Sequence, residues 1–325
     1  MSDLVLVTGG AGYVGAALVE QLRESGRPVR VLDVLLHDQD EVGVRLEQLG
    51  AEVRRGNIRE EAGRRSALEG AGALVHLAAI VGDPACARDP ELAQAVNVDA
   101  TRAIADEARS AGVAHMVFAS TCSNYGRMAD PTVAVDETAE LAPVSLYAEQ
   151  KVEVETMLLS GSTAPMAATC LRLATVYGVA ARMRFDLTVN EFTRDLWADR
   201  ELEVFGEQFW RPYVHVRDAA RAMTMVLAAG PEAMGGEVFN VGDSDENYRK
   251  LDLVEIITGE LGRGNVSYVH RDEDPRDYRV AFDKVHQQLG FEPSMRVPDG
   301  VREVAGALDD GAFEDPWATA YRNTP

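Results

Sequence analysis

The sequence predicts an α/β fold in which a doubly wound parallel sheet is combined with a smaller, interleaved C-terminal domain. Short apolar runs alternate with amphipathic helical segments through the first half of the chain, as in strands joined by helical crossovers. A glycine-rich turn directly follows the first apolar run, and an acidic residue ends the second. With 325 residues, the chain is long enough to bury the large core of such a fold.

The order of apolar and amphipathic segments places the elements. In the first half, the strongest strand candidates are residues 4–8, 29–34, 73–79, 115–120 and 167–174. Val14, Leu18 and Leu22 recur every four residues, and residues 93–108 show a similar period, so both segments are expected to be helices that cover the sheet. The rhythm changes after Gly178, where a helix, a short strand and a strand-to-helix unit follow.

We therefore predict two interleaved domains without a clear linker between them. The sheet domain covers residues 1–178, and the chain returns to it at about residues 212–242. The smaller domain comprises residues 179–211 and 243–325.

The composition excludes several classes of partner. A formal net charge of −21 and a pI near 4.7 repel nucleic acid and anionic membrane surfaces, so neither is expected to bind. No uncharged stretch approaches the 18 residues of a membrane span. The three cysteines, Cys86, Cys122 and Cys170, are too few for a disulfide framework and lack the spacing of a zinc site. We expect a cytoplasmic protein without a bound metal.

The first turn has the pattern of a dinucleotide-binding loop. Gly9, Gly12 and Gly15 lie between the first expected strand and the first expected helix, where backbone N–H groups and the helix dipole can approach a pyrophosphate. Asp33 ends the second strand, where a carboxylate accepts hydrogen bonds from the two hydroxyls of an adenosine ribose. It would repel a 2′-phosphate, so the sequence favours NAD over NADP. Asn57 and Ile58, at the end of the third strand, are candidates to flank the adenine.

A tyrosine and a lysine lie four residues apart in the stretch YAEQK. Tyr147 and Lys151 would share one face of a helix, where the ammonium favours the phenolate and lowers the pKa of the tyrosine. By itself such a pair is common on helices, and a plain surface helix is the simpler interpretation. The residue type adds an argument, because lysine occurs only at positions 151, 250 and 284 among 32 basic residues.

Several motifs together resemble the extended short-chain dehydrogenase/reductase superfamily, in its nucleotide-sugar epimerase/dehydratase branch, over about residues 4–284. The motifs are the glycine loop with Asp33, HLAA at 76–79, Asn97, STCSNYG at 120–126, YAEQK at 147–151, LRLATVYG at 171–178 and WRPYVHVRDAARA at 210–222. The resemblance implies a Rossmann domain that holds NAD and a smaller substrate domain that holds a nucleoside-diphosphate sugar.

The resemblance also implies the site residues. The expected catalytic residues are Thr121, Tyr147 and Lys151. The expected NAD-binding residues are Gly9, Gly12, Tyr13, Val14, Gly15, Asp33, Asn57, Ile58, Leu77, Ala78, Ala79, Asn97, Tyr147 and Lys151. The expected substrate-binding residues are Thr121, Cys122, Ser123, Thr175, Asn190, Arg211 and Arg276. Of these, Arg211, Arg276 and Asn190 match diphosphate-contacting positions of the family.

Two departures from the family pattern narrow the expected chemistry. The 4,6-dehydratases of the family carry an Asp-Glu pair after the catalytic threonine, and here those positions are Cys122 and Ser123. Neither replaces a carboxylate, so a dehydratase is disfavoured. Cys122 is either a base at the substrate or a small packed residue. Thr175 stands where galactose-type epimerases have a substrate-contacting asparagine, which leaves the sugar and its nucleotide open.

The sequence thus predicts an NAD-dependent nucleotide-sugar 4-epimerase that works through a transient 4-keto sugar. Two alternatives remain open at this point. One is an NAD(P)H-dependent reductase of nucleotide 4-ketosugars, and the other is a non-catalytic regulator that binds a dinucleotide. The resemblance further implies a homodimer formed through the helices that contain Asn97 and Tyr147.

Overall fold

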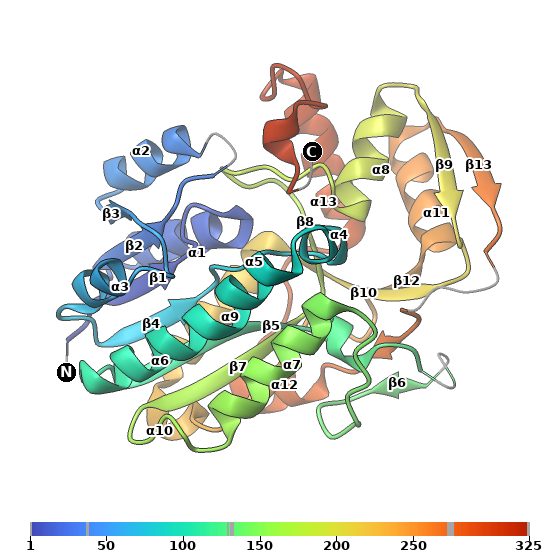
Figure 1. The fold of residues 1–325 in the computed structure, drawn as a ribbon. Coiled ribbons are helices and arrows are strands. Elements are labelled where there is room, and N and C mark those ends of the chain that lie inside the picture. Colours follow the sequence, from blue (N-terminus) through green and yellow to red (C-terminus); the bar gives the residue numbers. More distant parts are fainter. Residues whose placement is uncertain (1, 37–38, 129, 131–132, 272–275, 324–325) are drawn as a thin grey trace.

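A seven-stranded, fully parallel sheet forms the centre of the computed structural model, which describes residues 2–323 except 37–38, 129, 131–132 and 272–275 (Figure 1). The strand order is β11-β7-β5-β4-β1-β2-β3. The strands are β1 (Val5–Thr8), β2 (Val29–Asp33), β3 (Glu52–Arg55), β4 (Ala73–His76), β5 (His115–Thr121), β7 (Ala167–Leu173) and β11 (Val238–Val241). This sheet confirms the predicted α/β class.

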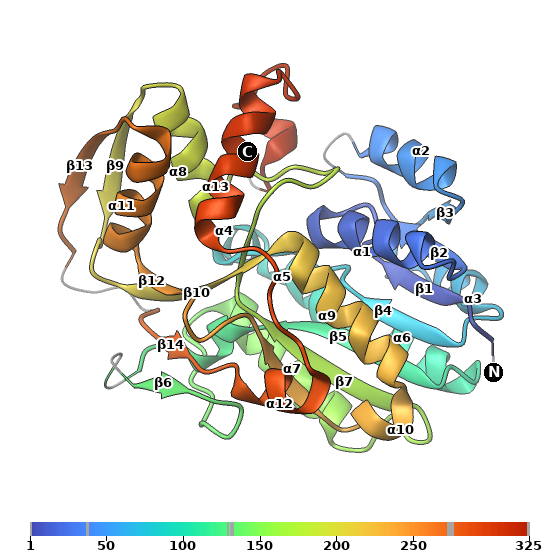
Figure 2. The ribbon, with the colours of Figure 1, turned by 180° about the vertical axis from the view of Figure 1, so that it is seen from behind.

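Helices cover both faces of the sheet. One face carries α1 (Tyr13–Glu24), α2 (Asp40–Gln48), α9 (Val216–Ala229), α10 (Pro231–Met234) and α12 (Asp283–Leu289), which are in front in Figure 2. The other face carries α3 (Glu61–Leu68), α4 (Asp83–Arg88), α5 (Pro90–Gln94), α6 (Ala100–Ser110) and α7 (Leu146–Leu159), which are in front in Figure 1. Side chains of a strand alternate between the two faces, so Val5 and Val7 belong to one apolar core and Leu6 to the other.

A second group of elements lies beyond the carboxyl ends of the sheet strands (Figures 1 and 2). Three of its strands form a small sheet in the order β12 (Asn247–Arg249), β10 (Trp210–His215) and β8 (Thr175–Tyr177). The others form two pairs, β9 (Glu201–Phe205) with β13 (Asn265–Val269) and β6 (Ala134–Val135) with β14 (Arg279–Val280). Its helices are α8 (Thr188–Trp197), α11 (Lys250–Leu261) and α13 (Val297–Asp309), which pack around a third apolar core.

The chain crosses between the two groups several times. Strand β8 leaves the large sheet directly after β7, and β11 returns to the edge of that sheet beside β7. Strand β10 starts two residues before the predicted return segment at 212–242 and extends into it, but it pairs with β8 and β12 in the small sheet. The predicted helix over 93–108 is interrupted by a π-helical turn at Ala95–Asp99.

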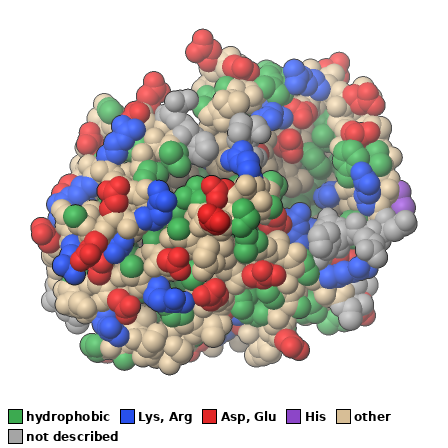
Figure 3. Space-filling view, in the orientation of Figure 1, with side chains coloured by type: hydrophobic (Ala, Val, Ile, Leu, Met, Phe, Trp, Pro, Cys, Tyr) green, Lys and Arg blue, Asp and Glu red, His purple; other side chains and the backbone are tan. Residues whose placement is uncertain are grey.

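Charged side chains of both signs are interspersed on the face shown in Figure 3. Many of the arginines pair with acidic groups, as Arg30 does with Glu52 at 2.7 Å and Arg102 with Glu153 at 3.1 Å. In the described part of the chain, no helix is long and apolar enough to cross a membrane.

Candidate active site

A cavity of about 620 Å³ lies between the carboxyl edge of the large sheet and the second group of elements. The loops that follow β1, β2, β4 and β5 form one wall, and α7 contributes Tyr147 and Lys151. The segments after β7 and β8, together with Arg276 and Tyr278, form the opposite wall. Ligands of open α/β sheets bind at this edge, because the strand order reverses there and opens a crevice.

The glycine loop leaves no room for side chains at two positions. Gly9 has a φ of +71°, and a Cβ there would lie 2.7 Å from the backbone nitrogen of Ala78. A Cβ on Gly15 would lie 2.2 Å from the carbonyl oxygen of Gly9. Helix α1 starts just after Gly12, so its N-terminus faces the cavity that the loop lines. This arrangement fits a dinucleotide diphosphate, which backbone N–H groups and the helix dipole would bind.

Asp33 closes the loop from the end of β2. Its Oδ2 accepts a hydrogen bond from the backbone nitrogen of Ala11 at 2.9 Å, and its Oδ1 accepts one from Leu35 at 2.9 Å. Burial raises the pKa of the Asp33 carboxyl, while the backbone donors and the Arg182 guanidinium act in the opposite direction. Each oxygen keeps a lone pair for a ribose hydroxyl, which fits the predicted contact with NAD.

The remaining predicted cofactor residues divide into two groups. Those that line the cavity are Tyr13, Val14, Asn57, Ile58, Leu77, Ala78 and Ala79. Asn97 does not line it. Its side-chain oxygen accepts from the backbone nitrogen of Ile80 at 2.7 Å, and its amide donates to the Ile80 carbonyl at 3.0 Å and to Gln150 at 2.9 Å. Asn97 therefore holds the loop after β4 from behind.

The three predicted catalytic side chains line the same cavity. Thr121 ends β5, and Tyr147 and Lys151 lie one turn apart on α7, which begins at the N-cap Ser145. The Lys151 ammonium donates to the carbonyl oxygen of Ala119 at 2.6 Å. It also lies 4.5 Å from the centre of the Phe118 ring and 5.8 Å from that of Tyr147. A compact ammonium fits between these groups, with donors left for a ligand.

The electrostatics of this pair differ from the sequence-based expectation. Burial raises the pKa of the Tyr147 phenol, and the nearby Cys86 and Asp83 act in the same direction, whereas Arg184 opposes the rise. Burial also lowers the pKa of Lys151 to about 8. The predicted lowering of the tyrosine pKa by the lysine is therefore not what this structure gives, because desolvation outweighs the neighbouring charge.

Three predicted substrate residues besides Thr121 face the cavity. Ser123 and Thr175 line it, and the Ser123 hydroxyl lies 3.4 Å from the Tyr278 hydroxyl. Arg276 also lines it and forms an ion pair with Asp83, Nη1 to Oδ2, at 3.0 Å. This pair joins the loop after β4 to the segment before β14.

The other three predicted substrate residues are used inside the protein. The buried thiol of Cys122 donates to the carbonyl oxygen of Arg172 at 3.2 Å, and burial raises its pKa, which disfavours the thiolate. Asn190 is fully buried and bonds the backbone of Gly178 and Arg184 and the hydroxyl of Tyr13. Arg211 is 8% exposed, donates to the carbonyl oxygen of Trp210 and stacks over Tyr278. None of the three is among the residues that line the cavity, so their contacts with a substrate stay a prediction.

The structure also brings residues to the cavity that sequence reasoning missed. They are Asp83, Arg182, Arg184 and Tyr278. Arg184 forms two hydrogen bonds to Asp186 at 2.9 and 2.8 Å. The arginine-rich stretch RMR at 182–184, just after the VYG motif, was the available signal for two of these residues.

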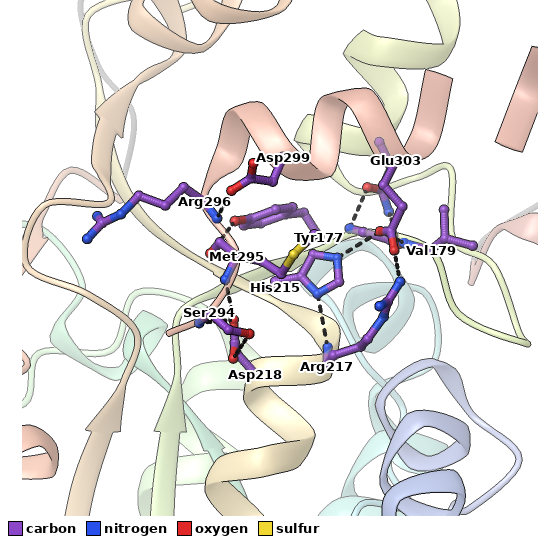
Figure 4. A network of polar contacts seen from close by, with 12 residues as sticks. Tyr177, Val179, His215, Arg217, Asp218, Ser294, Met295, Arg296, Asp299 and Glu303 are labelled. Atoms are coloured by element: carbon purple, nitrogen blue, oxygen red, sulfur yellow. Dashed lines mark hydrogen bonds and ion pairs between the residues drawn. The ribbon is translucent and has the colours of Figure 1, made fainter. Parts of the chain in front are cut away.

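A buried polar network fixes the far wall from behind (Figure 4). His215 ends β10 and its Nε2 lies 2.8 Å from Oε2 of Glu303 on α13. The same oxygen accepts from the backbone nitrogen of Val179 at 2.9 Å, and Gly178 packs against the His215 ring so closely that a Cβ would lie 2.1 Å from it. The turn that follows β8 is therefore held in one conformation, and with it the start of the segment that carries Arg182.

Within the described residues, no group of three or more His, Cys, Asp or Glu side chains is arranged to hold a metal ion. Tyr147, Lys151 and Thr121 line the cavity beside the glycine loop. Fold and site together define an NAD-binding enzyme of the extended short-chain dehydrogenase/reductase type.

Comparison with known proteins identifies the family. Residues 5–242 match the model of the NAD dependent epimerase/dehydratase family, and the chain belongs to this family. The UDP-glucose 4-epimerase of Streptomyces lividans is 29% identical over 321 residues, covering 90% of this chain and 92% of the relative. The dTDP-glucose 4,6-dehydratase of Streptomyces niveus is 28% identical over 326 residues, covering 96% and 95%.

A solved structure supports the cofactor. The UDP-glucose 4-epimerase of Thermus thermophilus, crystallised in complex with NAD, superposes with a TM-score of 0.82 at 25% identity, covering 95% of this chain and 100% of the other. NAD is accordingly the cofactor of this family member. The glycine cradle and the carboxylate of Asp33 are the features of this chain that fit it.

Proposed function

We propose that this protein is an NAD-dependent 4-epimerase of a nucleoside-diphosphate sugar. One observation carries the proposal. Thr121, Tyr147 and Lys151 line one cavity, while the two positions after the threonine, Cys122 and Ser123, offer no carboxylate for a dehydration. Epimerisation at a carbinol carbon needs one proton-transferring group on the hydroxyl, whereas loss of water also needs a separate acid and carbon base.

The proposed roles follow from the positions of the side chains. Tyr147 exchanges a proton with the 4-hydroxyl of the sugar, and Thr121 donates a hydrogen bond to the same oxygen as charge develops on it. Lys151 positions the cofactor ribose through the donors not bound to Ala119. NAD, when bound, supplies a reversible hydride acceptor for the carbon that carries that hydroxyl. The 4-keto sugar rotates in the cavity before it is reduced again. Its other face then receives the hydride, which yields the epimer.

The substrate diphosphate is proposed to lie against Arg276. Its guanidinium lines the cavity and pairs with the carboxylate of Asp83. A phosphate can replace this carboxylate, because the planar guanidinium can donate two parallel hydrogen bonds to either group. Arg184 is a second candidate, since it lines the same wall and affects the pKa of Tyr147. Ser123 and Thr175 are proposed to contact the sugar.

The test is incubation with a panel of UDP-, dTDP-, GDP- and CDP-hexoses without added reductant, followed by chromatographic analysis of the sugars. The proposal predicts that one pair of C4 epimers reaches equilibrium from either side. Net consumption of NADH or NADPH with a 4-keto sugar would instead show a reductase. Formation of a 4-keto-6-deoxy sugar would show a dehydratase and contradict the proposal.

Replacing Tyr147 by Phe tests the assigned proton transfer. We expect turnover to fall by about 100-fold or more, because general acid–base catalysis contributes about that much, while NAD binding is retained. The matched control is Tyr268→Phe, since Tyr268 is 45% exposed on β13 and does not line the cavity. Unchanged turnover in the Tyr147 variant would exclude the mechanism, and no turnover by the unmodified protein on any sugar of the panel would favour a regulator.

A homodimer through the helices that contain Asn97 and Tyr147 is part of the proposal; these are the π-helical turn Ala95–Asp99, which α6 continues, and α7. The two helices lie side by side on one face of the sheet, joined by the ion pair of Arg102 and Glu153 at 3.1 Å (Figure 1). Light scattering coupled to gel filtration should give twice the chain mass of 35.3 kDa. A monomer at micromolar concentration would contradict the dimer but not the epimerase.

A further inference from the structure

Arg182 is a buried arginine of the cavity wall whose charge is not matched by a carboxylate. It lies in the segment between β8 and α8, which reaches from the small sheet across to the end of the large sheet near α2 (Figures 1 and 2). Arg182 lines the cavity, yet only 5% of its surface is exposed. Its Nη2 donates to the carbonyl oxygen of Arg322 at 3.2 Å, and its Nε has no hydrogen-bond partner.

Four other buried arginines give the contrast. Arg30, Arg64, Arg172 and Arg194 are equally buried, and each pairs with a carboxylate within 2.9 Å. None of the ion pairs among the described residues includes Arg182, and the nearby carboxylate of Asp186 pairs with Arg184 at 2.8 Å instead. A guanidinium withdrawn from water without a counter-charge is unfavourable, so a chain that keeps one at a cavity wall has a reason to keep it for an anionic ligand.

The neighbours of Arg182 indicate which part of the cavity it serves. Burial lowers its pKa to about 10 and the Arg184 charge acts in the same direction, whereas Asp186, Asp33 and Tyr13 oppose the lowering. Asp33 and Tyr13 belong to the glycine-loop side of the cavity, where the dinucleotide is expected.

We infer that Arg182 is the side-chain counter-charge of the cofactor diphosphate, acting from the wall opposite the glycine loop. The loop supplies backbone N–H groups and a helix N-terminus, which carry only partial positive charge. Arg182 adds a full charge and an unused Nε–H donor to the same region. In a protein with a net charge of −21, this local cation offsets the field that opposes a doubly negative ligand.

The C-terminal tail holds this arginine in place. The carbonyl oxygen of Arg322 accepts the hydrogen bond from Arg182. Two further hydrogen bonds join the tail to the segment that carries Arg182. The backbone nitrogen of Phe185 donates to the carbonyl oxygen of Tyr321 at 2.9 Å, and the backbone nitrogen of Asn323 donates to Asp186 at 3.0 Å. The rings of Phe185 and Tyr321 also pack edge to face, with their centres 5.7 Å apart. A preorganised side chain loses less entropy on binding, so the tail contributes to cofactor affinity through Arg182.

The diphosphate could come from the cofactor or from the sugar nucleotide, and the test separates the two. Arg182→Gln is compared with the unmodified protein by calorimetric titration with NAD, ADP-ribose, adenosine and UDP. We expect NAD and ADP-ribose to bind about 10- to 100-fold more weakly, as for a lost hydrogen bond to a charged group. Adenosine and UDP should change by less than about twofold, and Arg182→Lys should retain part of the NAD affinity.

Two controls keep the inference falsifiable. Arg65→Gln removes the same charge from an exposed position on α3 and should leave the affinities for NAD, ADP-ribose and UDP unchanged. The Arg182→Gln protein should unfold at the same temperature as the unmodified one or higher when no nucleotide is added, because an unmatched buried charge has been removed. Unchanged NAD affinity, an equal loss for adenosine, a loss for UDP instead, or a large loss of stability would each overturn the assignment.

The inference rests on NAD as cofactor and is independent of the epimerase reaction. A protein that binds NAD through Arg182 but converts no sugar would leave it standing, while the proposed function would fail.

Discussion

A buried ion pair beneath the active site offers the sharpest test of how the catalytic elements are held together. Arg172 on β7 donates from Nε to both carboxylate oxygens of Glu155 on α7, at 3.0 and 3.2 Å, and its Nη2 makes a further short contact. Glu155 also accepts from Ser120 at 2.8 Å and from Asn124 at 3.3 Å. Since Ser120 directly precedes Thr121, one carboxylate joins the strand of the catalytic threonine to the helix of the catalytic tyrosine.

Glu155→Gln keeps the size of the side chain and removes its charge. The buried guanidinium of Arg172 is then left without a counter-charge, a change that destabilises proteins by about 3–5 kcal/mol. An entropy of unfolding of about 2.1 cal/mol/K per residue gives about 0.7 kcal/mol/K for 325 residues. The expected loss therefore lowers the midpoint of thermal unfolding by about 4–7 °C.

The assay is urea unfolding followed by circular dichroism, in parallel with the thermal scan. Glu153→Gln is the matched control, because Glu153 is on the same helix, is half exposed and pairs only with the exposed Arg102, so a loss below about 1 kcal/mol is expected. The double variant Glu155→Leu with Arg172→Met should recover most of the loss. A Glu155→Gln loss no larger than that of the control would refute the reasoning.

Three further expectations follow from the site. Gly15→Ala places a Cβ 2.2 Å from the Gly9 carbonyl oxygen and should abolish NAD binding in calorimetry, so retained affinity would contradict the cradle. Lys151→Arg should lower kcat by about 100-fold with the fold intact, and normal turnover would show that no compact ammonium is needed. Burial lowers the pKa of His76 to about 3 and that of His115 to about 4, so both stay neutral in the folded protein while the unfolded chain protonates near pH 6.5. The free energy of unfolding therefore keeps its full value above pH 6.5 and decreases as the pH falls. For His76 the decrease between pH 7 and pH 4 is about 3 kcal/mol. The His76→Asn variant should show a weaker pH dependence of this free energy in urea titrations.

The fold was predictable because its signals are local. Strands buried on both faces read as continuous apolar runs, and β2 and β5 end within one residue of the predicted positions. The π-helical turn at Ala95–Asp99 was not predictable. Asn97 within it forms hydrogen bonds with Ile80 and Gln150, which are both distant from Asn97 in the sequence. Local periodicity in residues 93–108 carried no information about those partners.

The same distinction explains which site residues were foreseen. The glycine loop and the Tyr147–Lys151 pair are short motifs whose geometry follows from one turn or one helix, and the structure places both at the cavity. Which arginine faces the cavity depends instead on tertiary neighbours. Arg211 matches a family position, yet it stacks over Tyr278 behind the wall, while Arg182 belongs to none of the motifs used and lines the cavity.

The contrast between these two arginines shows that a match to a family motif does not establish whether an arginine faces the cavity. A guanidinium can be satisfied by an aromatic ring and a backbone carbonyl, as at Arg211, and it then has less reason to bind an anion. A guanidinium with one carbonyl partner and a free Nε, as at Arg182, keeps its charge available to the cavity. We therefore expect Arg182 to bind an anionic ligand of the cavity more strongly than Arg211 does, and titration of the Arg182 variants with ADP-ribose and UDP tests the Arg182 part of this expectation.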